Sequence, residues 1–322
     1  MSRLKQDRQF LIIMIMLALV EGLRFFDHTL HFHSAPMGIM QNYRFAELTL
    51  LIFFICTILF FGFCLKKISN TQKTTCYLLL ALLSVFLFPM YFNENYFGTM
   101  DVYAWCFLFI SIFCIMQEKG MIFVPVLSFL SGAICPMSIF TTNLMLLETC
   151  LIVGRQKENR WRFVGMVSYI CAGIGGALNY QFGVFQTDAI YAFTFRKFAV
   201  ACILLIPYLI IAIRMFVKLI KSLKKNRTFY LISVILGLPG ILVYLCLADY
   251  SRVVVYGFVY FILLILSFLL EGDKKVEKVV EESIVILGDG VGRAVFVAYP
   301  FLIMTFWISG PLTLFEETFV AL

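Results

Sequence analysis

The first residues that could carry chemistry are Asp27 and His28, followed closely by His31 and His33; the chain contains three histidines in all. A carboxylate in a partly apolar pocket can take a proton from a hydroxyl group, and an adjacent imidazole can orient it. Asp27 and His28 are therefore predicted to be catalytic. The spacing of the three histidines also permits metal ligation. The alternative is an interfacial loop that uses histidine as an amphipathic residue, and we assign no metal site.

A second polar cluster is the segment Asp249-Tyr-Ser-Arg252. On a helical turn, residues three apart lie on one face. The pair could be an ion pair that holds two helices together, or Arg252 could bind a phosphate through its planar fork while Asp249 orients it. We predict Asp249 as a catalytic residue and Arg252 as a substrate-binding one. Further charged residues predicted to bind substrate on the same side are Arg44, Asp101, Asp188, Arg196 and Lys197.

The segments that must position these residues are strongly apolar. The 322 residues are 62% hydrophobic and 14% charged, with a mean hydropathy of +0.95, whereas an average soluble domain has about 25% charged residues. Many apolar runs have the length of a membrane-crossing helix, about 17–25 residues. The longest strongly polar stretch, 271–283, is too short to be a domain. We therefore expect an all-α transmembrane bundle that forms one integral membrane domain over 1–322, with no soluble domain.

The phosphate-binding loop typical of nucleotide-hydrolysing domains does not occur in the sequence. There is no GxxxxGK[ST] loop, and the glycine-rich segment 288–292 lacks the lysine. A built-in nucleotide-hydrolysing domain is therefore excluded, and the identity of any cofactor is left open.

The distribution of lysine and arginine predicts the topology, because short basic loops stay in the cytoplasm. The basic loops are 1–9, 65–73, 154–162, 214–227 and 271–293. Alternation predicts spans near 9–26, 46–64, 75–92, 102–116, 163–180, 199–215, 229–247, 253–270 and 292–309. The apolar stretch 121–153 would be about 50 Å long as one helix, and Pro136 interrupts it. Parity requires an even number of crossings there, so we predict two short spans or a re-entrant pair.

The resulting expectation is a multi-pass protein with about 11 spans and a cytoplasmic N-terminus. The polar residues named above then gather at the outer ends of the helices, where they could share one cavity.

Other residues are predicted to be structural. The ten cysteines lie in or beside apolar runs without a CxxC pair, which is typical of small buried hydrophobes. Glu148, near the cytoplasmic end of its span, is expected to extend into the headgroup layer. Close approach of a neighbouring helix is predicted at the small residues Gly165, Ala172, Gly173, Gly175 and Gly176. The lysine-rich segment 214–225 indicates an anchor on anionic lipid and not a nucleic-acid site.

Three pieces of the sequence carry a resemblance to known families. They are GTMDVYAWCFLF at 98–109, the apolar hairpin with Pro136, and LPGILVYLCLADYSRVVVYGFVYF at 238–261. These pieces follow a sequence pattern in which an aspartate begins a middle span, a proline interrupts a later span, and an Asp-aromatic-x-Arg element lies at an external helix junction. The chain resembles bacterial membrane glycan polymerases and, more distantly, GT-C-class glycosyltransferases, loosely over 96–270.

The resemblance implies roles for three of the polar residues. Asp27 would be the first-loop acid that acts on lipid-linked sugar, and Asp249 with Arg252 would meet the lipid phosphate. The sequence departs from the pattern in two ways: its first loop has Asp-His in place of two acids, and it lacks the long external loop found in ligases.

Three functions from different classes follow as expectations. The first is a glycosyltransferase or glycan polymerase in a bacterial plasma membrane, acting at the outer face on polyprenyl-phosphate-linked sugars, since cytoplasmic nucleotide sugars do not reach that face. Its partners would be membrane lipids, the lipid-linked glycan and other proteins of glycan assembly. The second is a lipid or small-solute transporter or flippase subunit, which needs ionisable groups at mid-membrane depth. The third is a non-catalytic partner in a glycan-assembly complex.

Overall fold

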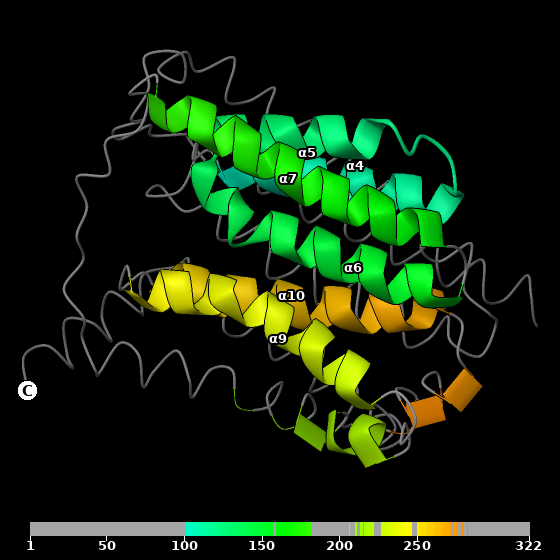
Figure 1. Ribbon diagram of the computed structural model, residues 1–322. Coiled ribbons are helices and arrows are strands. Elements are labelled where there is room, and N and C mark those ends of the chain that lie inside the picture. The colour runs from blue at the N-terminus through cyan, green and yellow to red at the C-terminus, as the bar shows by residue number, and fades with distance from the viewer. Residues whose placement is uncertain are drawn as a thin grey trace, which may run out of the picture.

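The computed structural model describes most of the second third of the chain and parts of the last third (Figure 1). The described residues are 101–156, 159–181, 206, 210, 213, 214, 216–221, 227–246, 250–271, 274, 275, 278, 279 and 282. Their elements are the α-helices α4 (Asp101–Gln117), α5 (Phe123–Ile134), α6 (Thr142–Gln156), α7 (Asn159–Gln181), α9 (Arg227–Cys246) and α10 (Tyr250–Glu271), with the 3-10 helix η1 (Pro136–Ile139). No strand occurs among these residues, so the all-α prediction is confirmed for this part of the chain.

The ends of the apolar runs mark the ends of the helices. The predicted spans 102–116 and 253–270 correspond to α4 and α10, which begin or end at most three residues beyond them. The other two predicted spans in this part of the chain, 163–180 and 229–247, correspond to α7 and α9. The predicted spans that precede residue 101 and the one at 292–309 lie outside the described residues, and of the span predicted at 199–215 only residues 206, 210, 213 and 214 are described.

The stretch 121–153 contains two helices, α5 and α6, as predicted. The backbone of Cys135 leaves the helical region (φ −131°, ψ 92°), because a proline disfavours the helical conformation of the residue before it. Pro136 then opens η1, at a position where its missing N–H is not needed. The two helices thus meet at a corner formed by residues 135–141.

Two helical segments of the described part are long and apolar enough to cross a membrane. They are Pro136–Arg155, which joins η1 to α6, and Asn159–Tyr180 in α7. The outer face of α7 has the character that a bilayer requires. Its exposed side chains recur every three or four residues and are apolar: Phe163, Met166, Ile170, Ile174 and Leu178. Soluble proteins rarely expose a continuous apolar face of this kind.

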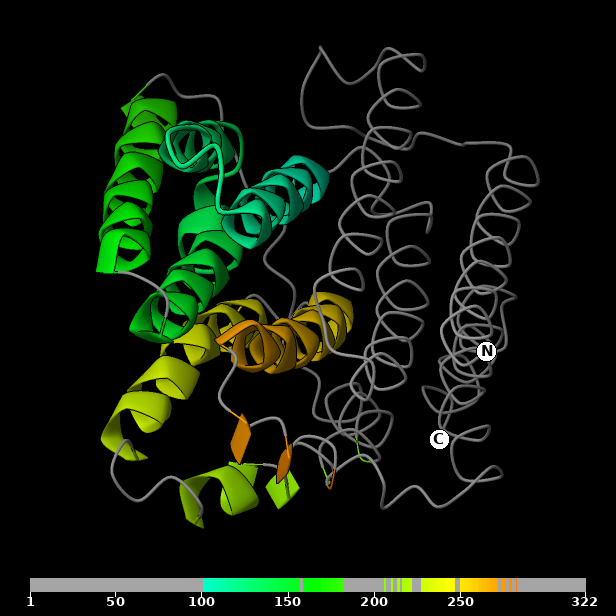
Figure 2. The same cartoon turned by 90° about the vertical axis from the view of Figure 1, so that its right-hand side faces the viewer.

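Glycine and alanine let α7 lie close to α5. The α-carbon of Gly132 faces the backbone of Ala172, and Gly175 faces the backbone of Phe129. Figure 2 shows α7 on the side of α5 and α6 that faces away from α10. The prediction of close approach is thus confirmed at Ala172 and Gly175.

The remaining predicted small residues give two different results. Gly165 packs against Cys150, and Gly176 packs against Ile139. Gly173 has nothing within 4 Å of the place where a β-carbon would be, so the prediction was wrong there. The physical reason is helical phase: Gly173 is turned away from α5 and α6.

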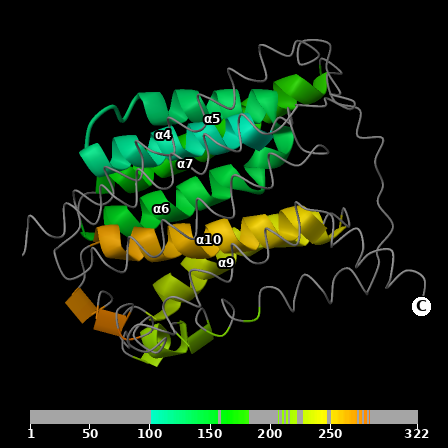
Figure 3. The ribbon, with the colours of Figure 1, turned by 180° about the vertical axis from the view of Figure 1, so that it is seen from behind.

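The helices α4, α6 and α10 run in the same direction, so their first residues lie at one end of the bundle (Figure 3). Near the starts, the rings of Trp105 in α4 and Tyr256 in α10 lie 6.4 Å apart. The Tyr256 hydroxyl also lies 3.3 Å from the carbonyl oxygen of Thr141, just before α6. At the opposite end, Arg155 of α6 and Glu271 of α10 are paired at 3.0 Å. We name the two ends the Asp101 end and the Arg155 end.

Candidate functional site

Two of the predicted site residues lie on described helices. Asp101 is the first residue of α4, and Arg252 is the third residue of α10. Each is followed four residues later, about one turn, by one of the rings in contact, Trp105 and Tyr256. The backbones of Asp101 and Arg252 therefore lie at the same end of the bundle. The other predicted residues lie outside the described part of the chain: Asp27, His28, Arg44, Asp188, Arg196, Lys197 and Asp249.

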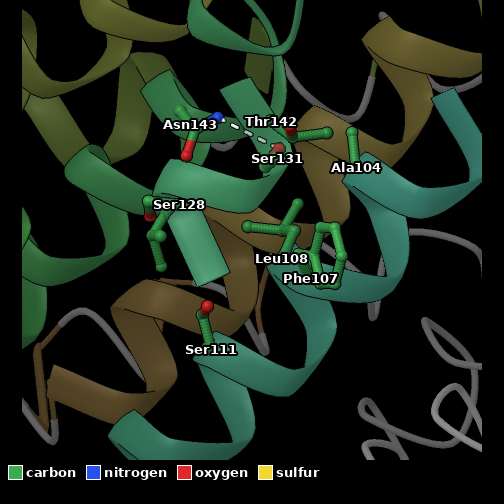
Figure 4. A pocket seen from close by; sticks show the side chains of 9 residues that line it. Ala104, Phe107, Leu108, Ser111, Ser128, Ser131, Thr142 and Asn143 are labelled. Carbon is green, nitrogen blue, oxygen red and sulfur yellow. Dashed lines mark hydrogen bonds between the residues drawn. The ribbon is translucent and has the colours of Figure 1, made fainter. Parts of the chain in front are cut away.

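A cleft lined by hydroxyl groups lies between α4, α5 and α6 (Figure 4). It comprises about 150 Å³ of space between the atoms. Its lining residues are Ala104, Phe107, Leu108 and Ser111 from α4, Ser128 and Ser131 from α5, and Thr142, Asn143 and Leu146 from α6. Ala104 is three residues after Asp101, so this hydroxyl cleft extends from near the Asp101 end toward the middle of the helices.

One side of the hydroxyl cleft is held by the amide of Asn143. Its Nδ2 atom lies 3.2 Å from Ser131 Oγ, 3.0 Å from Ser138 Oγ and 3.2 Å from the Ser138 carbonyl oxygen. These bonds join α5, η1 and α6 at the corner next to Pro136. The amide thereby fixes the position of Ser131 in the lining.

Three other hydroxyl groups of the lining have no hydrogen-bond partner within the described structure. They are the side-chain oxygens of Ser111, Ser128 and Thr142, all buried. A buried polar group without a partner costs about 1–3 kcal/mol. Three such groups, from three helices, line one constricted cleft. As packed, the cleft leaves no room for a water molecule, so a ligand could reach these hydroxyl groups only if α4 separated from α5 and α6.

A second buried polar group lies between α6 and α10. Glu148 is 2% exposed and accepts a hydrogen bond of 3.2 Å from the hydroxyl of Tyr260. The expectation that Glu148 extends into the headgroup layer was therefore wrong. Glu148 points toward α10, and it lies seven residues, about 10 Å along the helix, inside Arg155.

Tyr256 and Tyr260 were not among the predicted site residues. Their rings stack at 6.3 Å with an interplanar angle of 5°, and they pack against Gly237 and Gly240 of α9. The Tyr256 hydroxyl lies 3.2 Å from the carbonyl oxygen of Gly237. The signal in the sequence was the spacing of four between two tyrosines in an apolar run, which places both on one helix face.

Below Glu148, toward the Arg155 end, the two helices are joined by further polar contacts. The hydroxyl of Ser267 donates to Thr149 Oγ1 at 2.9 Å, and the pair of Arg155 with Glu271 follows. Both predicted cytoplasmic loops 154–162 and 271–293 thus begin at the same end of the bundle.

The described part of the chain contains free thiols but no cluster of metal ligands. No group of three or more His, Cys, Asp or Glu side chains that could hold a metal ion is found among these residues. Free thiols are recorded at Cys106, Cys114, Cys135, Cys150 and Cys171. Three of them are buried, as expected for cysteines that pack as small hydrophobes.

Comparison with protein-family models, curated proteins and solved structures finds no match to this chain.

Proposed function

We propose that the chain is a multi-pass glycosyltransferase or glycan polymerase of a bacterial plasma membrane. It would have about 11 spans and a cytoplasmic N-terminus, and would use polyprenyl-phosphate-linked sugars at the outer face. One observation supports this proposal: three features lie together at the Asp101 end. They are the start of α4 at Asp101, the start of α10 near Arg252, and the part of the hydroxyl cleft nearest that end. An acid, an arginine and neutral hydroxyl groups are the groups that a lipid-linked sugar requires.

The reaction transfers a sugar from a phosphate oxygen to a hydroxyl oxygen. The acceptor hydroxyl attacks the anomeric carbon of the donor, the bond from that carbon to the phosphate oxygen breaks, and the lipid phosphate leaves with the electron pair. Asp27, oriented by His28, takes the proton of the attacking hydroxyl. Arg252, oriented by Asp249, binds the phosphate and stabilises its developing charge.

Other predicted residues complete the site. Arg44, Arg196 and Lys197 add positive charge for the phosphate, and Asp101 and Asp188 accept hydrogen bonds from sugar hydroxyls. The hydroxyl cleft is too narrow for a sugar as packed, so Ser111, Ser128 and Thr142 would meet a sugar hydroxyl only after α4 separates from α5 and α6.

A transporter or flippase subunit is the second candidate, and Glu148 favours it. An acid inside a membrane helix is a typical component of an ion or proton pathway. Against a pathway, the described contacts of Glu148 are with Tyr260 and the tyrosine stack, which close the α10 side of its carboxyl group.

The two candidates are separated by complementation of a strain that lacks the gene. Asp27→Ala and Arg252→Ala are expected to abolish glycan extension, with lipid-linked precursor accumulating, while the protein remains in the membrane at its normal level. Glu148→Gln is expected to retain extension. A matched control is Arg160→Ala, which removes an exposed charge at the other end of the bundle.

Normal extension in both the Asp27 and Arg252 variants would overturn the enzymatic proposal. Loss of extension in Glu148→Gln alone would favour the transporter.

A further inference from the structure

Two guanidinium groups converge on one aromatic ring at the Arg155 end. The Cζ atom of Arg155 lies 5.6 Å from the ring centroid of Phe229, and the Cζ atom of Arg162 lies 5.9 Å from it. Arg155 is in the last turn of α6, Arg162 is in the first turn of α7, and Phe229 is in the first turn of α9. Three helices thus bring these side chains together. We name them, with Glu271, the Arg155–Arg162 cluster.

Among the described residues of this cluster there are two guanidinium groups and one carboxylate. The carboxylate is that of Glu271, whose fully buried side chain accepts a hydrogen bond from Arg155 Nη1. Arg162 supplies a second positive charge. Its Nε atom is buried and has no hydrogen-bond partner within the described structure. Arg162 as a whole is only half-buried, and hydrogen bonds between charged groups are strong, so an anion that reaches its guanidinium group at the surface would be bound favourably.

Arg162 is also held in place by its neighbours. A β-carbon at Gly154 would lie 2.8 Å from Arg162 Cγ and 3.0 Å from its backbone nitrogen. The preceding residue, Trp161, is 1% exposed and anchors this turn in the core. The side chain is therefore ordered before any ligand binds, which lowers the entropy cost of binding.

The neighbouring surface of α7 is apolar. Phe163 and Met166 are 65% and 49% exposed, and Ile170 continues the same face toward the middle of the helix. A ligand with an anionic head and hydrocarbon chains matches this arrangement, because the head can accept from Arg162 while the chains lie along α7. A guanidinium binds phosphate well, since its planar fork matches two phosphate oxygens.

We propose that the Arg155–Arg162 cluster binds the phosphate headgroup of an anionic phospholipid in the leaflet at the Arg155 end. The acyl chains of this lipid lie against Phe163, Met166 and Ile170. Exposed lysines of the same region, Lys221, Lys274, Lys275 and Lys278, add positive potential around the headgroup. The proposal depends on membrane insertion and is independent of the proposed glycosyl transfer.

Native mass spectrometry of the purified full chain in mild detergent tests the site, with dioleoyl phosphatidylglycerol and dioleoyl phosphatidylcholine as probes. The wild-type protein is expected to retain phosphatidylglycerol more tightly than phosphatidylcholine. Arg162→Gln is expected to weaken phosphatidylglycerol binding about tenfold, in line with the loss of one charged hydrogen bond. Arg162→Lys keeps the charge without the fork, so its affinity is expected to lie between the two.

Arg160→Gln is the matched control, because Arg160 is an exposed arginine two residues earlier on the same helix. It is expected to bind phosphatidylglycerol like the wild type. Equal losses in Arg160→Gln and Arg162→Gln would indicate diffuse charge and overturn the proposal. Inorganic phosphate is tested as a further probe. Suppose that it stabilises the wild-type protein but not Arg162→Lys, and that phosphatidylglycerol binds no more tightly than phosphatidylcholine. The site then binds soluble phosphate, and the lipid proposal is wrong. Should Arg162→Gln not fold, Arg162→Lys and the two lipids still decide the outcome.

Discussion

The contrast between Gly173 and Gly175 provides a sharp test of how α7 packs. Both glycines lie in the same helix, two residues apart, so replacing each by alanine makes the same chemical change. At Gly175 the new methyl group would meet the backbone of Phe129 and lie 2.8 Å from the backbone nitrogen of Ala133. Backbone atoms of a packed helix cannot move aside as a flexible side chain can. At Gly173 the methyl group would meet nothing within 4 Å.

The two substitutions are therefore expected to change stability in opposite directions. Overpacking a well-packed interface costs about 1–3 kcal/mol. Displacing α7 from α5 also disturbs the bond from Asn179 Nδ2 to the Ala133 carbonyl oxygen. Alanine gains up to about 1 kcal/mol over glycine in a helix, and this gain applies at both positions. We expect Gly175→Ala to lower stability by up to about 2 kcal/mol and Gly173→Ala to raise it by up to about 1 kcal/mol.

The assay is thermal unfolding of the purified protein in one detergent. Unfolding is measured as the loss of the fraction that stays monodisperse after heating. The expected order of melting temperature is Gly173→Ala at or above wild type, then wild type, then Gly175→Ala. If Gly175→Ala melts at or above Gly173→Ala, the close contact of α5 with α7 is refuted.

Two further predictions concern polar contacts. Tyr260→Phe removes the donor to the buried carboxyl group of Glu148, and it is expected to lower the free energy of unfolding by about 1–3 kcal/mol. Adding Glu148→Leu should recover most of that loss, since both partners are then apolar; a double variant as unstable as Tyr260→Phe would contradict this. At the surface, the hydrogen bond and the charge of Lys218 lower the pKa of the Glu282 carboxyl group. The contact therefore stabilises the fold above the ordinary glutamate pKa of about 4.3, and the stabilisation disappears as the pH falls through the lowered pKa. A titration of labelled glutamate should show the Glu282 pKa rising in Lys218→Met, and an unchanged value would contradict the pairing.

The sequence predicted the ends of helices well where a charged residue or a proline interrupts an apolar run. Asp101 and Glu271 bound apolar runs, and they are the first residue of α4 and the last of α10. Pro136 divides the apolar stretch 121–153, because a proline removes a donor and restrains the residue before it. These signals are local, so they need no knowledge of neighbouring helices.

The faces of the helices were harder to predict. In an amphipathic soluble helix the polar face identifies the outside, but in a membrane helix both the lipid-facing and the buried sides are apolar. Glu148 and Gly173 were assigned to the wrong environments for this reason. The hydroxyl cleft was missed because Ser111, Ser128 and Thr142 come from three helices, and single serines in apolar runs carry no information on the register between helices.

The directions of the helices have an electrostatic consequence for the proposed reaction. Each helix has a partial positive charge at its start and a partial negative charge at its end, which favours anions at the start and cations at the end. At the Arg155 end this expectation is met by Arg155, the cation in the last turn of α6. At the Asp101 end the starts of α4, α6 and α10 lie together, but α5, α7 and α9 run the opposite way and end there. The positive fields of three starts and the negative fields of three ends largely cancel. A preference for a phosphate-bearing substrate over an uncharged molecule at this end therefore has to come from cationic side chains such as that of Arg252.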